Sequence, residues 1–257
     1  MGLEKEQKIN SLLKAQPSGT VYLTSWLTQN GFSNQLLDKY KKSNWLVSIG
    51  TGAMIRSGND VGYDGAIYAL QEQADMFVHP AGKTALSLLG KAHYLELSPN
   101  KVTVFGGKNE KLPTWCLKHD WGVTLDYYSS SFLSADIGLV DVGLKTFSIK
   151  VSSAARAMLE CLFLAPKNQE LIECYQLMEG LNNLRPNLVQ NLLESCTSIK
   201  VKRLFLYLAE KANHSWVKHL NIEKIDLGSG KRSIIKNGVY DSKYKITIPA
   251  EIANGEL

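Results

Sequence analysis

Polar and basic side chains follow one another in a short stretch of the chain, residues 33–42. Ser33, Asn34 and Gln35 come first, and Lys39, Lys41 and Lys42 come last. Hydroxyl and amide groups can hydrogen-bond the edges of bases, whereas lysine ammonium groups bind phosphate oxygens. The chemistry that this order of residue types favours is recognition of a nucleic acid rather than the making or breaking of bonds.

Two short helices and a hairpin would be needed to position these groups. Residues 33–43 are predicted to form a helix capped by Ser33, with Phe32 and Leu37 as a hydrophobic staple across its first turn. An Asn-Gly turn at residues 30–31 separates it from a preceding helix that Thr24 or Ser25 can cap. Strands at residues 45–49 and 53–56 then flank a Gly-Thr-Gly turn. This order of elements is typical of a winged helix-turn-helix.

In that arrangement each candidate residue has a role. We expect Asn34 and Gln35 to contact bases, and Ser33 to cap the helix and touch a phosphate. The lysines at positions 39, 41 and 42 should hold the DNA backbone, with Thr51 and Arg56 in or near the minor groove. Each feature also has a simpler explanation, since cations favour helix C-termini anyway and any two strands need a turn. Winged domains also serve as protein-interaction modules.

Composition sets wider bounds on the class of protein. With 257 residues the chain can form one large domain or two modest ones. Its charged fraction of 21% is that of an ordinary globular protein, and no apolar run is long enough to cross a membrane. The first ten residues lack the apolar segment of a signal peptide, so we expect a cytoplasmic protein. The net charge of +5 favours an anionic partner only weakly.

The cysteines and histidines do not suggest a metal or an active site. None of the four cysteines (116, 161, 174 and 196) forms a CxxC pair, so we expect free buried thiols. His214 and His219 are five residues apart without a glutamate in metal-binding register, and no GxSxG motif surrounds any serine. We therefore expect no enzyme activity, no cofactor and no metal. An enzyme whose active site has no recognised motif is kept as an alternative.

The rest of the chain predicts a mixed α+β protein of two domains, residues 1–93 and 94–257. Helices are expected at residues 3–15, 66–73 and 83–89, a strand at 76–78, and the domain boundary near His93. Strands at 94–97, 101–105, 122–128 and 144–151 precede four helices, at 155–164, 169–179, 187–196 and 201–212. The chain ends on β-prone segments at 233–236 and 244–248. The second domain is thus larger and mixes helices with strands.

Two further segments have a possible role in binding. The run from Gly228 to Arg232 looks like a phosphate loop, but Arg232 stands where that motif has Ser or Thr, and the residues that follow are β-prone. We interpret it as a basic turn in which Lys231 and Arg232 are candidate contacts to a nucleic-acid backbone. The aromatic residues at 115, 121, 127 and 128 are expected to pack in the core, with a stacking surface for RNA as the alternative.

Four segments together resemble the AbiEi family of antitoxins and transcriptional regulators from type IV toxin–antitoxin systems. They are residues 45–56, the block HPAGKTALSLLGKAHYL at 79–95, the Leu-Pro-x-Trp motif at 112–115, and the Gly-Ser-Gly-Lys-Arg run at 228–232. The resemblance spans nearly the whole chain, and the block at 79–95 is its most specific part.

The resemblance implies an abortive-infection regulator that acts in phage defence. Its N-terminal winged domain would bind inverted repeats in the promoter and repress its own operon. Its C-terminal domain would counteract a nucleotidyltransferase-like toxin without forming a stable complex, and the chain would be a monomer or would pair on DNA. The predicted recognition helix departs from expectation in carrying Asp38 and no arginine. The alternative is a winged protein-interaction module with an RNA-binding C-terminal surface.

Overall fold

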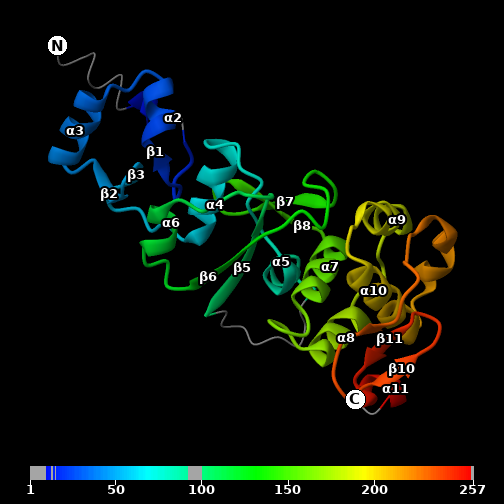
Figure 1. Cartoon of the computed structure of the whole chain (residues 1–257). Coiled ribbons are helices and arrows are strands. Elements are labelled where there is room, and N and C mark those ends of the chain that lie inside the picture. The colour runs from blue at the N-terminus through cyan, green and yellow to red at the C-terminus, as the bar shows by residue number, and fades with distance from the viewer. Residues whose placement is uncertain (1–9, 13, 15, 92–99, 256–257) are drawn as a thin grey trace. The chain divides into compact units, whose positions relative to one another are not determined.

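A computed structural model describes residues 10–12, 14, 16–91 and 100–255 (Figure 1). The helix expected at residues 3–15 falls mostly outside them, although residues 10–12 and 14 are helical. The strand expected at 94–97 and the boundary near His93 also lie outside the described residues. Contacts divide the chain into two compact units, one formed by residues 1–79, 99–129 and 141–150 and the other by the remaining segments.

The first unit begins with two helices and a hairpin, in the order that the sequence predicts. Its elements are β1 (Tyr22–Leu23), α2 (Thr24–Gln29), α3 (Asn34–Lys42), β2 (Leu46–Gly50) and β3 (Ala53–Arg56). The strands form an antiparallel sheet in the order β1-β3-β2. Leu27, Phe32, Leu37 and Met54 are buried in one cluster between the helices and this sheet. Burial of these apolar side chains holds the helices against the sheet.

The same unit continues with a helix and a small parallel sheet. Its remaining elements are α4 (Tyr63–Glu72), β5 (Lys101–Gly106), α6 (Thr114–Lys118) and β6 (Thr124–Ser129). Strands β5 and β6 pair in parallel, with α6 in the connection between them, and β4 (His79–Pro80) lies on the other side of β5. A separate two-stranded sheet is made by β7 (Leu139–Gly143) and β8 (Ser148–Ser152).

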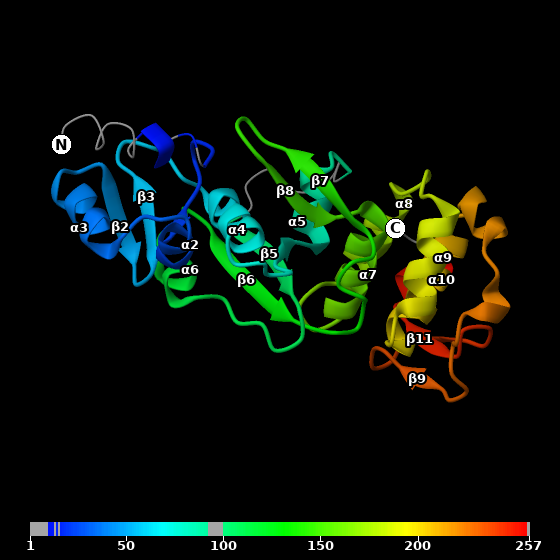
Figure 2. The ribbon, with the colours of Figure 1, turned by 90° about the horizontal axis from the view of Figure 1, so that it is seen from above.

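Helices dominate the second unit (Figure 2). They are α5 (Gly82–Leu88), α7 (Ala154–Leu164), α8 (Leu171–Glu179), α9 (Pro186–Ser195) and α10 (Ile199–Lys211), followed by the short 3-10 turns η1 (Ser215–His219) and η2 (Ile222–Lys224). A small sheet with the strand order β10-β11-β9 follows, made of β9 (Arg232–Ser233), β10 (Val239–Asp241) and β11 (Ile246–Ile248), and α11 (Ala250–Asn254) comes last. The α7 helix is buried along almost its whole length, so it forms the centre of this unit.

These elements confirm a mixed helix-and-sheet fold, and they correct two local predictions. No strand forms at residues 76–78; the chain pairs at His79–Pro80 instead. The side chains of Thr24 and Ser25 do not cap α2, because Thr24 already lies inside the helix and Leu23 is the cap residue. The Thr24 backbone N–H instead donates to the carbonyl oxygen of Gly52, at 2.9 Å, so the hairpin supplies the missing acceptor.

None of the described helices is long and apolar enough to cross a lipid bilayer.

Candidate nucleic-acid interface

The start of α3 is fixed by local interactions that the sequence encodes. Ser33 is the N-cap, and its Oγ accepts a hydrogen bond from the Leu36 backbone N–H at 3.3 Å. Phe32 and Leu37, on either side of the first turn, are both buried in the core of the first unit. Cap and apolar pair together anchor one face of the helix and leave the other face to solvent.

The exposed face of α3 presents two parallel stripes of polar side chains. Residues four and seven positions apart lie on one side of a helix, so Gln35, Lys39 and Lys42 form one stripe. The adjacent stripe consists of Asn34, Asp38 and Lys41. All six side chains are exposed, and Ser33 is exposed beside the amide groups at the N-terminal end. The face therefore carries hydrogen-bonding groups at its start and cations at its end.

One ion pair changes the charge of this face. Lys41 Nζ lies 2.7 Å from Asp38 Oδ1, and both side chains are well exposed. The hydrogen bond from Lys41, followed by the charge of the same group, lowers the pKa of the Asp38 carboxyl below its ordinary value. Asp38 therefore stays ionised at neutral pH and offsets part of the positive charge that the three lysines bring.

The hairpin holds its two candidate residues at opposite ends. Thr51 is exposed in the turn, where Gly50 and Gly52 both have positive φ angles. Arg56 lies at the base of the hairpin, paired with Leu46, and it is only half-exposed. Its charge also acts on Tyr22, where it opposes the effect of burial on the pKa of that phenol. The structure therefore does not bring Thr51 and Arg56 together.

The tip of the hairpin is held by neighbouring parts of the first unit. Gly52 accepts the Thr24 hydrogen bond at the start of α2. A Cβ atom placed on Gly50 would lie 2.7 Å from the Cβ of Trp115, which is closer than such atoms approach. Trp115 is buried and belongs to the Leu-Pro-x-Trp motif, which forms the start of α6. The motif thus fixes the hairpin at its turn.

Lys231 and Arg232 are exposed at the start of β9, far along the chain from α3. The glycine-rich turn before them is held from within by Arg203, which is buried. Its guanidinium donates to the backbone carbonyl oxygens of Leu227, Gly228, Gly230 and Lys245. A strand rather than a helix follows the turn, so it lacks the helix N-terminus on which a phosphate loop depends.

The described histidines are dispersed, and two of them are held in the interior. His79 and His214 are buried, with ring nitrogens 2.8 Å from the carbonyl oxygen of Phe77 and 2.7 Å from that of Met178. His214 also stacks on Trp216. Within the described part of the chain, no group of three or more His, Cys, Asp or Glu residues is arranged to hold a metal ion.

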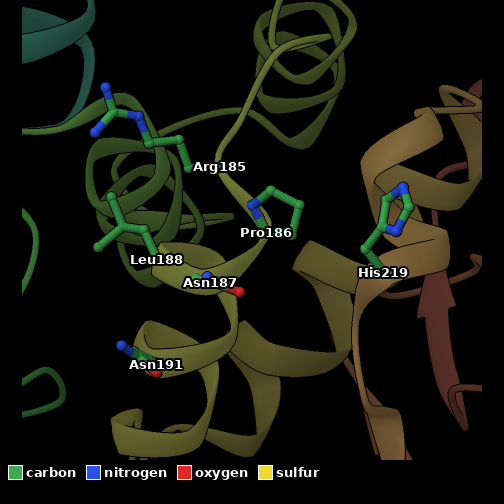
Figure 3. Close-up of a pocket in the computed structure, with 6 residues that line it drawn as sticks. All are labelled: Arg185, Pro186, Asn187, Leu188, Asn191 and His219. Atoms are coloured by element: carbon green, nitrogen blue, oxygen red, sulfur yellow. The ribbon is translucent and has the colours of Figure 1, made fainter.

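His219 lines an open hollow of about 720 Å³ at the N-terminal end of α9 (Figure 3). The other lining residues are Arg185, Pro186, Asn187, Leu188 and Asn191. Its polar side chains Arg185, Asn187, Asn191 and His219 are exposed, and no carboxylate or thiol lines it.

All four cysteines are buried and free, as the sequence predicts. Burial raises the pKa of Cys116 and of Cys174 to about 12. Thiols that stay protonated at neutral pH are poor nucleophiles and poor metal ligands. Their role in the described structure is packing.

One exposed aromatic residue was missed in the sequence. Tyr240 lies in β10 with 42% of its surface exposed, and Lys231 Nζ is 5.1 Å from the centre of its ring. The available signal was a tyrosine in a short β-prone run within the basic part of the chain. Of the aromatic residues that the sequence singles out for the core, Trp115 and Trp121 are buried, and Trp121 Nε1 donates to the Cys116 carbonyl. Tyr127 and Tyr128 are only partly buried.

Two family models cover nearly the whole chain, and together they define a class of transcriptional regulators. Residues 5–97 match the model described as the transcriptional regulator, AbiEi antitoxin N-terminal domain. Residues 99–249 match the model described as transcriptional regulator, AbiEi antitoxin, Type IV TA system. The chain therefore belongs to the AbiEi family of antitoxins and transcriptional regulators of type IV toxin–antitoxin systems, which confirms the resemblance seen in the sequence.

Comparisons with individual proteins add information about the fold. No protein of curated function matches the chain significantly. Among solved structures, the chain is similar to the RV2827C protein from Mycobacterium tuberculosis, with a TM-score of 0.60 and 11% sequence identity. The similarity covers 92% of this chain and 89% of that chain. At this identity the likeness shows a common fold and nothing about function.

Proposed function

We propose that residues 1–93 form a winged helix-turn-helix domain that binds inverted repeats in the promoter of its own operon and represses it. The observation that carries this proposal is the exposed face of α3, which has amides at its start and lysines at its end. The element order and the sheet order β1-β3-β2 support the winged assignment. The proposed boundary is close to residues 97–99, where the two family models meet.

In this proposal α3 enters the major groove. Asn34 and Gln35 contact bases, and Ser33 contacts a phosphate with the hydroxyl hydrogen that its cap role leaves unused. Lys39, Lys41 and Lys42 neutralise phosphates along the backbone. Thr51 reaches DNA from the turn, whereas Arg56 can contact DNA only beside the base of the hairpin. Binding to inverted repeats requires two copies of the chain on the DNA. The chain itself is a monomer, or two copies of it pair only on DNA.

Residues 94–257 are proposed to supply the antitoxin function against a nucleotidyltransferase-like toxin, without a stable complex between the two proteins. Membership of the family supports this part of the proposal. Because the matching family model describes an antitoxin and transcriptional regulator, we assign this domain a binding role. Lys231 and Arg232 remain its candidate contacts to a nucleic-acid backbone.

Lys41→Ala combined with Lys42→Ala tests the DNA-binding assignment. Each phosphate-contacting lysine adds about one unit to the slope of log affinity against log salt, so the double variant should lose about two units. Binding to the promoter duplex is measured by mobility shift over a range of salt concentrations. The matched control is Lys108→Ala with Lys111→Ala, which removes two exposed lysines from the connection between β5 and α6. An unchanged slope in the first variant, or an equal loss in the control, contradicts the assignment.

A further inference from the structure

The structure sorts the basic residues between positions 200 and 245 into two groups. Some serve the interior of the second unit: Lys200 Nζ donates to the carbonyl oxygens of Phe163 and Ala165, and Lys211 Nζ donates to that of Ala253. Lys202 and Arg203 are also buried, whereas Lys243 is exposed and pairs with Glu210 at 2.6 Å. The exposed remainder is Lys218, Lys224, Lys231, Arg232, Lys236 and Lys245. Four of these six lie in or beside the sheet of β9, β10 and β11.

That sheet has one face in the core and one face in solvent. Ile246 and Ile248 of β11 are buried, so Thr247 between them points to the opposite face. Thr247 is the register partner of Tyr240 on one side and of Ser233 on the other. These three residues therefore form a row across the outward face, with Thr247 Oγ1 3.4 Å from Ser233 Oγ.

Lys231 completes this row. Its Nζ lies 5.1 Å from the centre of the Tyr240 ring, which places the cation over the ring. We use the term outer sheet face for Lys231, Ser233, Tyr240 and Thr247. It combines an exposed aromatic ring, two hydroxyl groups and a cation.

The acidic groups near this face are engaged elsewhere. Asp226 accepts the Gly228 backbone N–H at 2.8 Å, and Asp241 accepts the Tyr244 backbone N–H at 2.6 Å. Glu210 is held by Lys243. The buried Arg203 adds a positive charge beneath the neighbouring turn, where it donates hydrogen bonds to backbone carbonyl oxygens. Asp226 and Asp241 keep their charges, but the four exposed basic residues in or beside the sheet outnumber them, so the surface potential is positive, which favours a polyanion.

We propose that the outer sheet face binds single-stranded RNA. A tyrosine ring can stack only on a base that is not already stacked in a duplex, and every base offers such a face. The hydroxyls of Ser233 and Thr247 both donate to the Ile235 carbonyl oxygen, and Thr247 Oγ1 also accepts the Ile234 N–H. Each oxygen therefore keeps acceptor capacity only, for a hydrogen donated by the ribose 2′-hydroxyl, a group that DNA lacks. Lys231 and the exposed lysines Lys236 and Lys245 follow the phosphates, whereas Arg232, the register partner of the buried Ile246, lies on the opposite face of the sheet. Because the bases of a duplex are already stacked, the exposed ring favours a single strand over duplex DNA.

This inference does not depend on the proposed repressor function. Its test uses the full chain and a fluorescein-labelled 12-nucleotide RNA of mixed sequence, with binding followed by fluorescence anisotropy at low salt. Tyr240→Ala removes the stacking ring and should weaken RNA binding by about tenfold or more. Tyr240→Phe keeps the ring and should retain affinity within about twofold, which separates stacking from any loss of folding. Unlabelled single-stranded DNA should compete less well than RNA, and duplex RNA least.

Charge is tested by a pair of matched double variants. Lys231→Ala with Lys236→Ala should weaken RNA binding and lower the salt slope by about 1.4, since each single-strand phosphate contact adds about 0.7. Lys218→Ala with Lys224→Ala removes the same charge from η1 and η2, and it should change RNA affinity less than twofold. The Lys41 and Lys42 double variant should bind RNA normally even where it has lost promoter DNA.

Several results would overturn the inference. They are an absence of RNA binding by the intact chain at low salt, equal competition by duplex and single strand, and equal losses in the two lysine pairs. Retained affinity in Tyr240→Ala would also overturn it. Because promoter binding is scored separately, a failure here leaves the DNA-binding proposal standing, and the reverse also holds.

Discussion

Single charged side chains set the potential of the proposed DNA-reading helix. Asp38 lies in the same stripe of α3 as Asn34 and Lys41, and its carboxylate is 2.7 Å from Lys41 Nζ. A carboxylate at this position repels phosphate and holds a lysine that would otherwise be available to it. It also accepts hydrogen bonds, which would suit a cytosine amino group. The two roles have opposite consequences for binding.

Asp38→Asn distinguishes them. If the carboxylate mainly offsets the lysines, its removal should tighten promoter binding by about twofold to fivefold, the range expected for an exposed ion pair. Affinity is measured by fluorescence anisotropy at one fixed salt concentration. Glu72→Gln makes the same charge change at an exposed position on α4 and should leave affinity nearly unchanged. Weaker binding in Asp38→Asn would instead assign Asp38 to base recognition.

Cys116 gives the molecule a sensitivity to alkaline pH. Burial raises the pKa of its thiol to about 12, whereas the thiol titrates near 9.0 without burial. Below the lower value both states are protonated and this group adds no pH dependence. Between the two values the unfolded state loses its proton while the folded state keeps it, so stability falls as pH rises.

From about pH 8 to about pH 10.5, the wild-type chain should lose about 2 kcal/mol more unfolding free energy than Cys116→Ala does. Urea titrations at the two pH values measure this difference. Thr114→Ala, an exposed and non-titrating change on the same helix, should follow the wild type. Parallel loss in wild type and Cys116→Ala would show that the thiol is not the cause.

At the scale of elements, the hairpin of β2 and β3 is more tightly held than an isolated wing. Its turn accepts the first backbone hydrogen bond of α2 and lies against the backbone of α6 at Trp115. Gln73 strengthens the same region, since its amide nitrogen donates to the Val21 carbonyl and its amide oxygen accepts from the Leu23 N–H. Strand β1 is thus bound by Gln73 as well as by β3, and the hairpin turn is bound by α2 and α6, which should keep the hairpin in a constant position relative to α2.

Gly50→Ala tests how far α6 supports the hairpin. Gly50 has a φ of +149° and its added Cβ would meet the Trp115 backbone, so the variant should lose about 2–3 kcal/mol of unfolding free energy. Gly52→Ala is the matched control. Gly52 also has a positive φ, of +86°, but no atom within 4 Å of the added group, so only the strain of about 1 kcal/mol applies. Equal losses in thermal or urea unfolding would mean that α6 does not support the hairpin.

Local signals account for the elements that the sequence predicts correctly. Ser33 caps α3 because a hydroxyl at that position meets free backbone N–H groups, and its neighbours Phe32 and Leu37 are close in sequence. The four late helices are bounded by Pro166, Gly180 and Pro186, whose effects are also local. The strand expected at residues 76–78 failed because its β-prone residues find other partners: the Phe77 N–H donates to Glu110, and the Val78 carbonyl accepts from Gln71.

The parts that were not predicted depend on contacts distant in sequence. Strands β7 and β10 and helix α6 are short, and each is defined by the element it packs against. Arg203 becomes structural only because a turn some 25 residues later brings its carbonyl oxygens around the guanidinium. The outer sheet face likewise requires the pairing of Tyr240 with Thr247 and of Thr247 with Ser233. No local pattern in the sequence reveals such a pairing.

At the scale of the whole molecule, the order of segments along the chain does not match the two compact units. Residues 80–98 belong to the second unit, although a segment of the first unit, residues 99–129, follows them. In the second unit, the Gly82 N–H at the start of α5 donates to the buried carboxylate of Glu160 on α7, at 3.1 Å. Lys83 Nζ is 2.7 Å from Glu173 Oε1 on α8. The family block at residues 79–95 therefore carries the helix that joins the N-terminal part of the chain to the second unit.

The consequence is that the two proposed domains should stay together when the chain is cut between them. A protease site introduced between residues 93 and 98 leaves α5 on the N-terminal fragment, while its partners α7 and α8 are on the other. Three other contacts cross the same cut within the first unit: Gly50 with Trp115, Phe77 with Glu110, and Gln71 with Lys150. We expect the cleaved fragments to elute together on gel filtration under native conditions.

The cut chain also allows the joint itself to be tested. Glu160→Ala removes the carboxylate that lies 2.9 Å from the Arg156 guanidinium in the interior, and it also removes the acceptor of the Gly82 N–H. The variant should therefore lose about 3–5 kcal/mol of unfolding free energy. Cleaved Glu160→Ala should therefore separate into its fragments at lower urea concentrations than the cleaved wild type. Glu179→Ala, an exposed acidic residue at the end of α8, is the control and should behave like the wild type. If the fragments of the cleaved wild type separate without denaturant, the packing of α5 does not hold them together. Residues 1–93 would then be an independent domain that is linked to the rest only by the chain.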